Sequence, residues 1–344
     1  MTLRLAINGF GRIGRMLLRA YLSDITRFDH LDIIAINDIA DAHTLLHLLK
    51  FDSTHGRLGV DAHLQDNHLI LQKNRQTLCR ILLLNQKSPT DIAWGELDID
   101  VVLECTGRFR SYDDASLHRL SGAKQVIIGS APFDTVDASV VMGVNDEILQ
   151  HTNLPIISGV SCTTQALVPL LHTLQVYGID SVMMTEIHAV TADQTVLDQA
   201  HRDLRRARAS GQNIIPTTSS SINASVRVLP FLQGKLSGHS IRVPTVNVAC
   251  IDITIIFEKD PTLDDIRELL RHTSQNHLRG IMDYTDEPLV SSDFIGDTHS
   301  LIIDGSQLMQ AGCQFKILAW YDNEVGYANR LLDMCVALSK AKQS

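Results

Sequence analysis

The chain has 344 residues, of which 44% are hydrophobic and 20% charged, and its formal net charge is −9. This composition is typical of a globular protein with enough apolar material for two domains. The negative charge argues against general binding to nucleic acids or membrane surfaces, and no apolar run approaches the roughly 18 residues of a membrane span.

The first half of the chain alternates between strand and helix patterns. Residues 3–8 predict a strand, 12–22 carry apolar residues at helical spacing, and 32–37 predict a second strand, so the chain opens with a βαβ unit. Helices are expected near 43–50 and 113–121, and further strands near 69–72, 79–84, 100–105, 125–128 and 139–142. This alternation predicts an α/β domain over 1–161, with the doubly wound, mostly parallel sheet of the Rossmann type.

The second half of the chain has a different pattern of predicted strands and helices. Its predicted strands are longer and its helices fewer, which indicates an α+β catalytic domain with a large, mostly antiparallel sheet over 162–322. Strands are expected at 181–190, 246–257, 301–304 and 315–320, and helices at 263–274 and 329–340. Thr262 and Asp265 form a plausible capping box at the start of the first of these helices. The segment 323–344, with the last helix, is expected to complete the first domain.

One long segment, residues 200–221, follows neither the strand nor the helix period and is rich in Arg, Ser and Thr. So long an irregular segment inside a compact domain is usually functional. No internal repeat, low-complexity tract or flexible linker interrupts the chain. The N-terminus starts directly with a strand pattern, so we expect no signal peptide. The six cysteines lack paired spacing, which is typical of a reducing cytoplasm and supplies no zinc site.

A glycine-rich turn follows the first predicted strand. Gly9, Gly11 and Gly14 form the pattern G-x-G-x-x-G at the start of a helix, and Asp38 ends the next strand. In this context the glycines would permit a tight turn, close approach of a pyrophosphate and helix–sheet packing. The pyrophosphate would lie at the helix N-terminus. Asp38 can accept hydrogen bonds from ribose hydroxyls and would repel a 2′-phosphate, which favours NAD over NADP.

Two weaker signals accompany the glycine turn. Thr106 and Gly107 follow the strand predicted at 100–105, at an edge where open α/β sheets bind ligands. By itself this pair is as consistent with an ordinary turn as with a cofactor contact. The polar segment 322–327 precedes the last helix, and Asn323 could bind the nicotinamide amide there, although an N-cap turn explains the segment equally well.

Cys162 lies at the junction between an apolar, β-rich run and a helical pattern over 165–177. Backbone N–H groups and the helix dipole favour a thiolate at a helix N-terminus. His188, from a neighbouring strand, would complete a nucleophile–base pair. Such a pair can add sulfur to an aldehyde, accept the hydroxyl proton as hydride leaves, and yield a thioester open to phosphate or water. A buried inert thiol is the usual role of a cysteine, but the position of Cys162 favours catalysis.

Positive charge is concentrated in the second half of the chain. Arg205, Arg206 and Arg208 form one group, and Arg242 lies in the segment 240–245. Arginine side chains bind phosphate oxygens in pairs, and Thr191 and the serines at 219–220 could add hydroxyl donors. A run of arginines is commonly a solvated surface, but an acidic protein that binds an anionic aldehyde needs such a local cluster.

These motifs together resemble the phosphorylating glyceraldehyde-3-phosphate dehydrogenase family over essentially the whole chain. The matching segments, in order, are 8–15 (NGFGRIGR), 35–38 (AIND), 52–56 (DSTHG), 106–107 (TG), 161–164 (SCTT), His188, 203–208 (DLRRAR), 214–216 (IIP), 242–245 (RVPT) and 321–324 (YDNE). The resemblance implies NAD as cofactor, a small phosphorylated aldehyde and inorganic phosphate as reactants, and a homotetramer. It also implies that the loop at about 190–220 lies beside the cofactor of a neighbouring subunit.

The resemblance also implies individual roles. Cys162 would be the nucleophile and His188 the base. Cofactor contacts are expected at Gly9, Gly11, Arg12, Ile13, Gly14, Asp38, Thr106, Gly107, Ser130, Asn323 and Tyr327. Thr191 and Arg242 would hold the substrate phosphate, Ser161, Arg206 and Ser219 would bind inorganic phosphate, and further substrate contacts are expected at Thr163 and Ser220.

The chain departs from the family pattern at two places near these residues. Gln165 stands where the family usually has Asn, and 219–222 read SSSI where it usually has TGAA. Because that glycine presents a backbone N–H to inorganic phosphate, Ser220 puts efficient phosphorolysis in question. The segments 137–141 (DASVV), 283–285 (DYT), 288–291 (PLVS), 293–294 (DF) and 304–305 (DG) resemble the erythrose-4-phosphate dehydrogenase branch, which releases acid by hydrolysis.

The sequence therefore predicts oxidation of glyceraldehyde 3-phosphate to 1,3-bisphosphoglycerate through a thioester at Cys162. The first alternative is oxidation of erythrose 4-phosphate to 4-phosphoerythronate, with hydrolysis of the thioester. The second is a non-catalytic, NAD-binding paralogue with a regulatory role. Retention of Cys162, His188, Arg206 and Arg242 together argues against a purely binding protein, which needs none of them.

Overall fold

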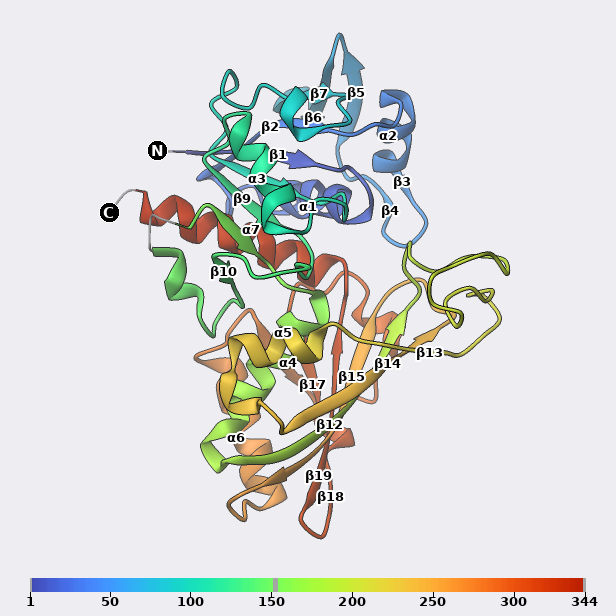
Figure 1. Ribbon diagram of the computed structural model, residues 1–344, viewed down its shortest axis with the longest axis vertical. Helices are drawn as coiled ribbons and strands as arrows, with labels where there is room; N and C mark the ends of the chain where they lie inside the picture. The colour runs from blue at the N-terminus through green and yellow to red at the C-terminus, as the bar shows by residue number, and fades with distance from the viewer. Residues whose placement is uncertain (1, 151–153, 343–344) are drawn as a thin grey trace. The chain divides into compact units, whose positions relative to one another are not determined.

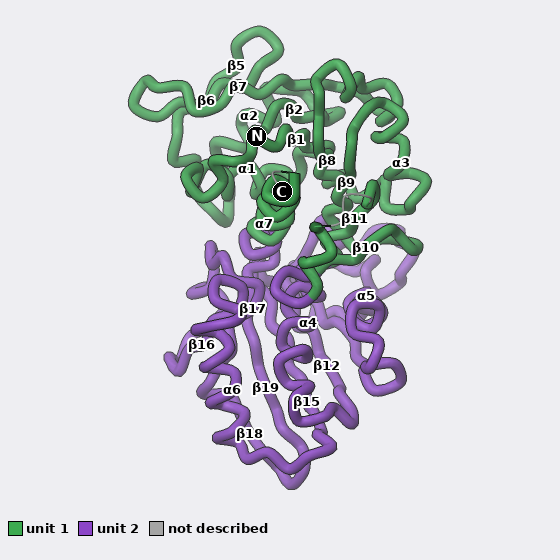
Figure 2. Tube along the Cα trace, turned by 90° about the vertical axis from the view of Figure 1, so that its left-hand side faces the viewer, with its two compact units in different colours: residues 1–140, 145–160, 328–344 green, residues 141–144, 161–327 purple. Residues whose placement is uncertain are grey.

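The computed structural model describes residues 2–150 and 154–342 (Figure 1). The chain divides into two compact units, one made of residues 1–140, 145–160 and 328–344, the other of 141–144 and 161–327 (Figure 2). The domain limits predicted from the sequence run close to these units and differ from them at 141–144, 161 and 323–327. Residues 343–344 of the predicted last segment lie outside the described residues.

The first unit contains a nine-stranded sheet whose centre is parallel and whose one edge is antiparallel. The six pairings from β10 to β7 are parallel, whereas β6 and β5 form an antiparallel edge. In sheet order the strands are β10 (Ala138–Ser139), β11 (Ile156–Ser158), β9 (Gln125–Ile128), β8 (Val101–Glu104), β1 (Leu3–Asn8), β2 (Leu31–Asn37), β7 (Gln76–Leu84), β6 (His68–Lys73) and β5 (Asp61–Gln65).

The central strands of this sheet are apolar because they are covered on both faces. Every residue of β8 is buried, as are the three apolar residues of β9, which is the usual pattern of parallel strands between helical layers. The helices of the unit are α1 (Arg12–Ser23), α2 (Ala42–Lys50), α3 (Tyr112–Leu120) and the greater part of α7 (Val325–Ala341), and a small hairpin joins β3 (Phe51–Asp52) to β4 (Gly56–Arg57). The predicted doubly wound fold is confirmed.

The second unit contains an eight-stranded, mostly antiparallel sheet. Two of its pairings are parallel, β12 with β14 and β16 with β17, and the others are antiparallel. In sheet order the strands are β13 (Ile215–Thr217), β14 (Leu236–Val243), β12 (Ile179–Ala189), β15 (Ala249–Phe257), β19 (Gln314–Tyr321), β17 (Leu301–Asp304) and β16 (Met282–Thr285), and β18 (Met309–Ala311) pairs with β19 outside this path. The predicted α+β architecture is confirmed.

Helices α4 (Cys162–Leu174), α5 (Ser221–Val228) and α6 (Leu263–Gln275) pack along this sheet (Figures 1 and 2). Helix α4 is almost wholly buried and supplies apolar residues such as Leu167 and Leu170 to the core. The predicted capping box of α6 is confirmed, since Thr262 accepts from the Asp265 N–H and Asp265 accepts from the Thr262 N–H. Short 3-10 helices occupy Pro89–Asp91, Asp146–Gln150, Gln175–Tyr177, Pro230–Leu232, Ser291–Phe294 and Gly305–Gln307.

Some predicted elements are wrong in extent, and others were missed. The strand expected at 139–142 is reduced to β10, two residues long, because the chain leaves the sheet after Ser139. The strand expected at 246–257 begins only at Ala249. Sequence reasoning missed β5, β14 and helix α5, and β13 interrupts the segment expected to be irregular at 200–221. The long strand β14 lacks a clear apolar alternation, which explains why its pattern was not recognised.

Candidate active site

Helix α4 begins at Cys162, as the sequence predicts. Ser161 is its N-cap, with a side-chain oxygen that accepts a hydrogen bond from the Thr164 N–H at 3.1 Å. The preceding residue, Val160, has φ +52° and is fully buried. A β-branched residue in this left-handed region carries strain of roughly 1–3 kcal/mol, which is typical of functional turns. The backbone therefore presents Cys162 at the first helical position.

His188 lies beside Cys162, with its Nε2 atom 3.6 Å from the Cys162 Sγ atom. It belongs to β12, and its other ring nitrogen, Nδ1, is 2.7 Å from the backbone oxygen of Ala189. Because a carbonyl oxygen only accepts, Nδ1 carries the proton. In the neutral ring Nε2 then has a free lone pair toward the sulfur, which is the tautomer a general base requires.

The charge state of this pair differs from the sequence-based expectation of a thiolate. Burial raises the pKa of the Cys162 thiol to about 11, and the charge of Glu186 adds to the rise against the opposing effects of Arg242 and Thr163. Burial also lowers the pKa of His188 to about 4. These directions differ from the lowered thiol pKa that the sequence predicts at the helix N-terminus, and they favour a neutral thiol beside a neutral imidazole.

A buried glutamate that sequence reasoning missed completes the cluster. Glu186 is 2% exposed, and its Oε1 atom accepts a hydrogen bond from the Thr163 hydroxyl at 2.7 Å. The same oxygen lies 4.0 Å from Nε2 of His188 and 3.9 Å from an Nη atom of Arg242. The sequence signal was available: Glu186 precedes His188 by two residues on one strand, so both side chains lie on the same face.

Of the predicted substrate-binding residues, Arg242 lies in the cluster around Cys162, whereas Thr191 and Arg206 contact residues of the loop that follows β12. Arg242 pairs with His188 in the register of β14 and β12 and donates to the Ala189 carbonyl at 3.4 Å, so it belongs to the cluster around Cys162. Thr191 lies just after β12, where its backbone N–H and hydroxyl donate to Gln194 Oε1. Arg206 forms an ion pair with Asp193 and donates a 2.9 Å hydrogen bond to the Thr217 hydroxyl.

The predicted serines lie at the ends of two helices. The Ser161 hydroxyl is 2.7 Å from that of Thr164, and the Ser219 hydroxyl is 2.7 Å from that of Ser221. Ser220 occupies the N-cap position of α5 without a side-chain cap. Thr163 is buried against Glu186 and the Tyr321 hydroxyl, which lies 2.9 Å from its own.

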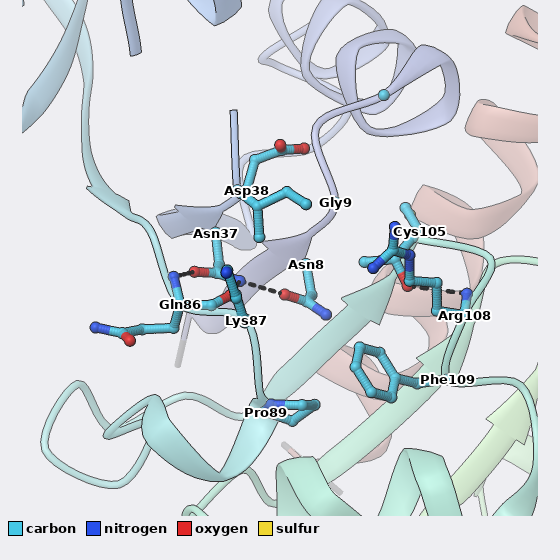
Figure 3. Close-up of a pocket in the computed structure, with 13 residues that line it drawn as sticks. Asn8, Gly9, Asn37, Asp38, Gln86, Lys87, Pro89, Cys105, Arg108 and Phe109 are labelled. Atoms are coloured by element: carbon cyan, nitrogen blue, oxygen red, sulfur yellow. Dashed lines mark hydrogen bonds between the residues drawn. The ribbon is translucent and has the colours of Figure 1, made fainter. Parts of the chain in front are cut away.

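The first unit contains a pocket at the carboxyl ends of β1, β2 and β8, where the sequence predicts NAD (Figure 3). At its base, Asn37 donates to Asn8 Oδ1 at 2.7 Å, and the Gln86 N–H donates to Asn37 Oδ1 at 2.8 Å. The lining residues are Asn8, Gly9, Gly11, Asn37, Asp38, Ile39, Gln86, Lys87, Pro89, Cys105, Thr106, Arg108 and Phe109.

The glycine turn fits a pyrophosphate. Gly9 has φ +92°, and a Cβ atom there would lie 2.7 Å from the Thr106 nitrogen; at Gly14 it would lie 2.2 Å from the Gly9 oxygen. A Cβ atom at Gly11 would meet nothing within 4 Å, so this backbone is open to a ligand. Helix α1 starts after Gly11 with no side-chain cap and no acidic residue in its first turn. Its N-terminus is thus suited to an anion.

The other predicted cofactor residues are distributed around this pocket and beyond it. Asp38 lines the pocket and accepts from the backbone N–H groups of Phe10 at 2.7 Å and Ala40 at 2.9 Å. Arg12 forms an ion pair with Asp52. Ile13, Gly107 and Ser130 belong to the same unit but are not among the lining residues, whereas Asn323 and Tyr327 belong to the second unit. Their cofactor roles stay predictions.

Among residues 2–150 and 154–342, no group of three or more His, Cys, Asp or Glu side chains is placed to hold a metal ion. No helix in this part of the chain is both long and apolar enough to cross a membrane.

Comparison with known proteins identifies the family. Residues 3–112 match the NAD binding domain of glyceraldehyde 3-phosphate dehydrogenase, and residues 161–323 match the C-terminal domain. A glyceraldehyde-3-phosphate dehydrogenase of Geobacillus stearothermophilus is 42% identical over 98% of this chain and 99% of its own length. Glyceraldehyde-3-phosphate dehydrogenase 2 of Bacillus subtilis is 42% identical over 97% of this chain and 96% of its own. The plasmid-encoded enzyme of Cupriavidus necator is 41% identical over 99% and 100%. NAD is the cofactor, and the chain belongs to the glyceraldehyde-3-phosphate dehydrogenase family.

Proposed function

We propose that the protein oxidises glyceraldehyde 3-phosphate with NAD through a thiohemiacetal and then a thioester on Cys162, with His188 as the base. The observation that carries this proposal is the 3.6 Å approach of the Cys162 sulfur to an unprotonated ring nitrogen at a helix N-terminus. The names of the relatives favour the three-carbon aldehyde over erythrose 4-phosphate.

His188 has two proton transfers to perform. Since the thiol is protonated near neutral pH, His188 Nε2 takes the thiol proton as sulfur bonds to the carbonyl carbon, and returns it to the new alkoxide oxygen. In the second step Nε2 takes the hydroxyl proton as the carbon loses hydride. NAD, when bound, accepts that hydride. The Cys162 N–H at the helix start and the His188 ring are placed to stabilise the oxyanion.

Arg242 and Thr191 are the proposed ligands of the substrate phosphate. Arg242 is adjacent to His188 across the β12–β14 pairing, and its Nε atom is buried without a hydrogen-bond partner. Its guanidinium can therefore donate to a phosphate near the reacting carbon. Steady-state kinetics on glyceraldehyde 3-phosphate and erythrose 4-phosphate test the choice of aldehyde, with a higher kcat/KM expected for the first.

The proposed assembly is a homotetramer. Four large apolar side chains at 196–214 are mainly exposed, and monomers rarely expose apolar patches without a partner. They are Val196, Leu197, Leu204 and Ile214. A second copy of the chain is the proposed partner, and light scattering should give four times the mass of the chain. All six cysteines carry free thiols, in keeping with the cytoplasmic location that we propose.

Replacement of the nucleophile tests the proposed reaction. Cys162→Ser should abolish NADH formation from the aldehyde while leaving NAD binding unchanged by fluorescence titration. The control is Cys313→Ser, which removes an exposed thiol from the turn before β19 and should keep the full rate. Undiminished NADH formation by Cys162→Ser would contradict the mechanism, and a wild-type protein that binds NAD without oxidising either aldehyde would support the regulatory alternative.

A further inference from the structure

We propose that Glu186 is the general base that activates water against the Cys162 thioester, so that the protein releases a free carboxylic acid instead of an acyl phosphate. The inference rests on the thioester chemistry proposed above. It replaces the phosphorolysis expected from the sequence with hydrolysis, and it assigns a catalytic role to a residue outside the predicted site.

Glu186 belongs to the same side-chain cluster as the reacting sulfur. Strand β12 alternates, and the side chains of Met184, Glu186 and His188 are buried on one face while Met183 is exposed on the other. Glu186 approaches both His188 and Thr163, and the latter is the residue directly after Cys162. Its negative charge is close enough to act on the Cys162 thiol. An acyl group on that sulfur would form beside this carboxylate.

The Glu186 carboxylate already uses the hydroxyl of Thr163, a residue that the sequence assigns to the substrate site. Thr163 donates its single hydroxyl proton to Glu186 Oε1, and therefore accepts from the Tyr321 hydroxyl. The Ser219 hydroxyl also contributes to the stabilisation of the Glu186 carboxylate. A phosphate at these donors would have to displace a buried negative charge or lie against it, which like charges oppose. Phosphate is therefore disfavoured at the Thr163 and Ser219 hydroxyls.

The second carboxylate oxygen of Glu186 lacks a hydrogen-bond partner in the part of the chain that the structure describes. Among residues 2–150 and 154–342, Oε2 is buried and has no hydrogen-bond partner. Buried carboxylate oxygens are normally hydrogen-bonded, because an unpartnered one is costly in free energy. A water molecule that donates to Oε2 would satisfy it, and the same hydrogen bond is the one a general base makes to its nucleophile.

The charge state of Glu186 suits this role. Burial alone raises the pKa of Glu186, but His188 in its protonated form, the charge of Arg242 and the hydroxyl groups of Ser219 and Thr163 together outweigh it and lower the pKa. The group is therefore ionised near neutral pH and ready to accept a proton.

The hydrolytic step balances without a further reactant. Oε2 takes one proton from water as the water oxygen bonds to the thioester carbon, whose carbonyl oxygen becomes an oxyanion. When the carbonyl re-forms, the carbon–sulfur bond breaks, and the Cys162 sulfur leaves with the electron pair. The proton held by Glu186 returns to that sulfur, so the net change is thioester and water to carboxylic acid and thiol. The preceding oxidation by NAD has already set the oxidation level of the carbon.

Transient and steady-state kinetics of Glu186→Gln separate deacylation from acylation. The variant should keep the first-turnover burst of NADH, because Cys162 and His188 are intact. Its steady-state rate should fall by roughly 10²–10⁴-fold, the usual contribution of a general base. Glu186→Asp should recover part of this rate. The control is Asp180→Asn, an exposed acid of the same strand β12, which should leave both phases unchanged.

The acceptor is identified in the wild-type protein by product analysis. In water labelled with ¹⁸O the label should enter the carboxylate product, and adding inorganic phosphate should leave the rate unchanged and form no acyl phosphate. Formation of acyl phosphate with a phosphate-dependent rate, or a normal steady-state rate in Glu186→Gln, would overturn the role of Glu186 while the burst persists. Absence of any burst in the wild-type protein would instead overturn the thioester chemistry itself.

Discussion

Each compact unit buries one histidine beside a glutamate, and the two pairs differ in how fully their polar atoms are hydrogen-bonded. In the first unit, His118 and Glu104 are joined by a 3.0 Å hydrogen bond. Trp94 donates to the other His118 nitrogen at 3.0 Å, so Nε2–H is the donor to Glu104. Asn8 donates to the same Glu104 oxygen at 2.6 Å, and Thr106 donates to the second. Every polar atom of this pair is satisfied.

In the second unit, His188 and Glu186 are only 4.0 Å apart and share no hydrogen bond. His188 directs its free nitrogen to a sulfur atom, and Glu186 leaves one buried oxygen without a partner among the described residues. The comparison separates two uses of the same residue types. The saturated pair, His118 and Glu104, has all its polar atoms hydrogen-bonded and fixes the base of the cofactor pocket through Asn8. The unsaturated pair, His188 and Glu186, keeps lone pairs that are available for a reaction.

The largest expected effect is on catalysis by the unsaturated pair. His188→Asn should slow NADH formation by roughly 10²–10⁴-fold, because no group then accepts the thiol proton or the hydroxyl proton. Stopped-flow measurement of the NADH burst gives this rate directly. The matched change His118→Asn should leave the burst rate per folded molecule within a few-fold of wild type. Equal losses in the two variants would remove the functional distinction between the pairs.

The saturated pair should matter most for stability. His118→Leu leaves Glu104 and the Trp94 indole N–H without partners in a buried place, which should cost about 3–5 kcal/mol in the free energy of unfolding. Urea denaturation measures it as a lower midpoint. The control, His277→Leu, changes an exposed histidine after α6 and should alter the free energy of unfolding by less than about 0.5 kcal/mol. A loss below about 1 kcal/mol in His118→Leu would contradict the structural role.

The ionisation of Cys162 offers a sharper test of the second pair. Only the thiolate is alkylated, and with a pKa of about 11 its fraction rises about tenfold for each pH unit in the range below that value. Alkylation of Cys162 should therefore accelerate about 100-fold between about pH 7 and pH 9. The measurement is best made in a Cys313→Ser background, which removes the exposed thiol. A rate independent of pH in this range would instead indicate a thiolate–imidazolium pair.

Much of the fold and the centre of the site could be predicted from the sequence. The two sheet types follow from alternating short elements in the first half and longer strands in the second, and the glycine turn has a pattern whose steric reason the structure shows at Gly9 and Gly14. Cys162 was placed at a helix start by its flanking patterns, and helix α4 begins there. These features depend on local periodicity and on turn stereochemistry, which neighbouring residues determine.

Features that depend on packing across the sheet could not be predicted in the same way. The raised pKa of Cys162 arises from burial and from Glu186, whose contact with the helix start requires β12 to lie beneath α4. Strand periodicity could have paired Glu186 with His188, but not with Thr163 or Tyr321, which are far apart in the chain. The lack of a hydrogen-bond partner for Oε2 of Glu186 among the described residues can be recognised only when the positions of all its neighbours are known.

The smallest expected effect is a decrease in the free energy of unfolding at acidic pH, caused by the burial of His188. Its pKa is about 4 in the folded protein and about 6.5 in the unfolded chain, so between these values the unfolded chain binds a proton that the folded protein does not. Stability must then fall as the pH is lowered, by about 2 kcal/mol between about pH 7 and pH 5, at roughly 1.4 kcal/mol per unit of pH.

Urea denaturation at the two pH values measures this loss, and His188→Asn should show a loss smaller by about that amount. The pKa of Glu186 is lowered, so it adds its own loss only at pH values more acidic than the chosen range. If wild type and His188→Asn lost stability equally, His188 would titrate alike in the folded and unfolded states. The free nitrogen that distinguishes the second pair from the first would then be a solvated group and not a buried base.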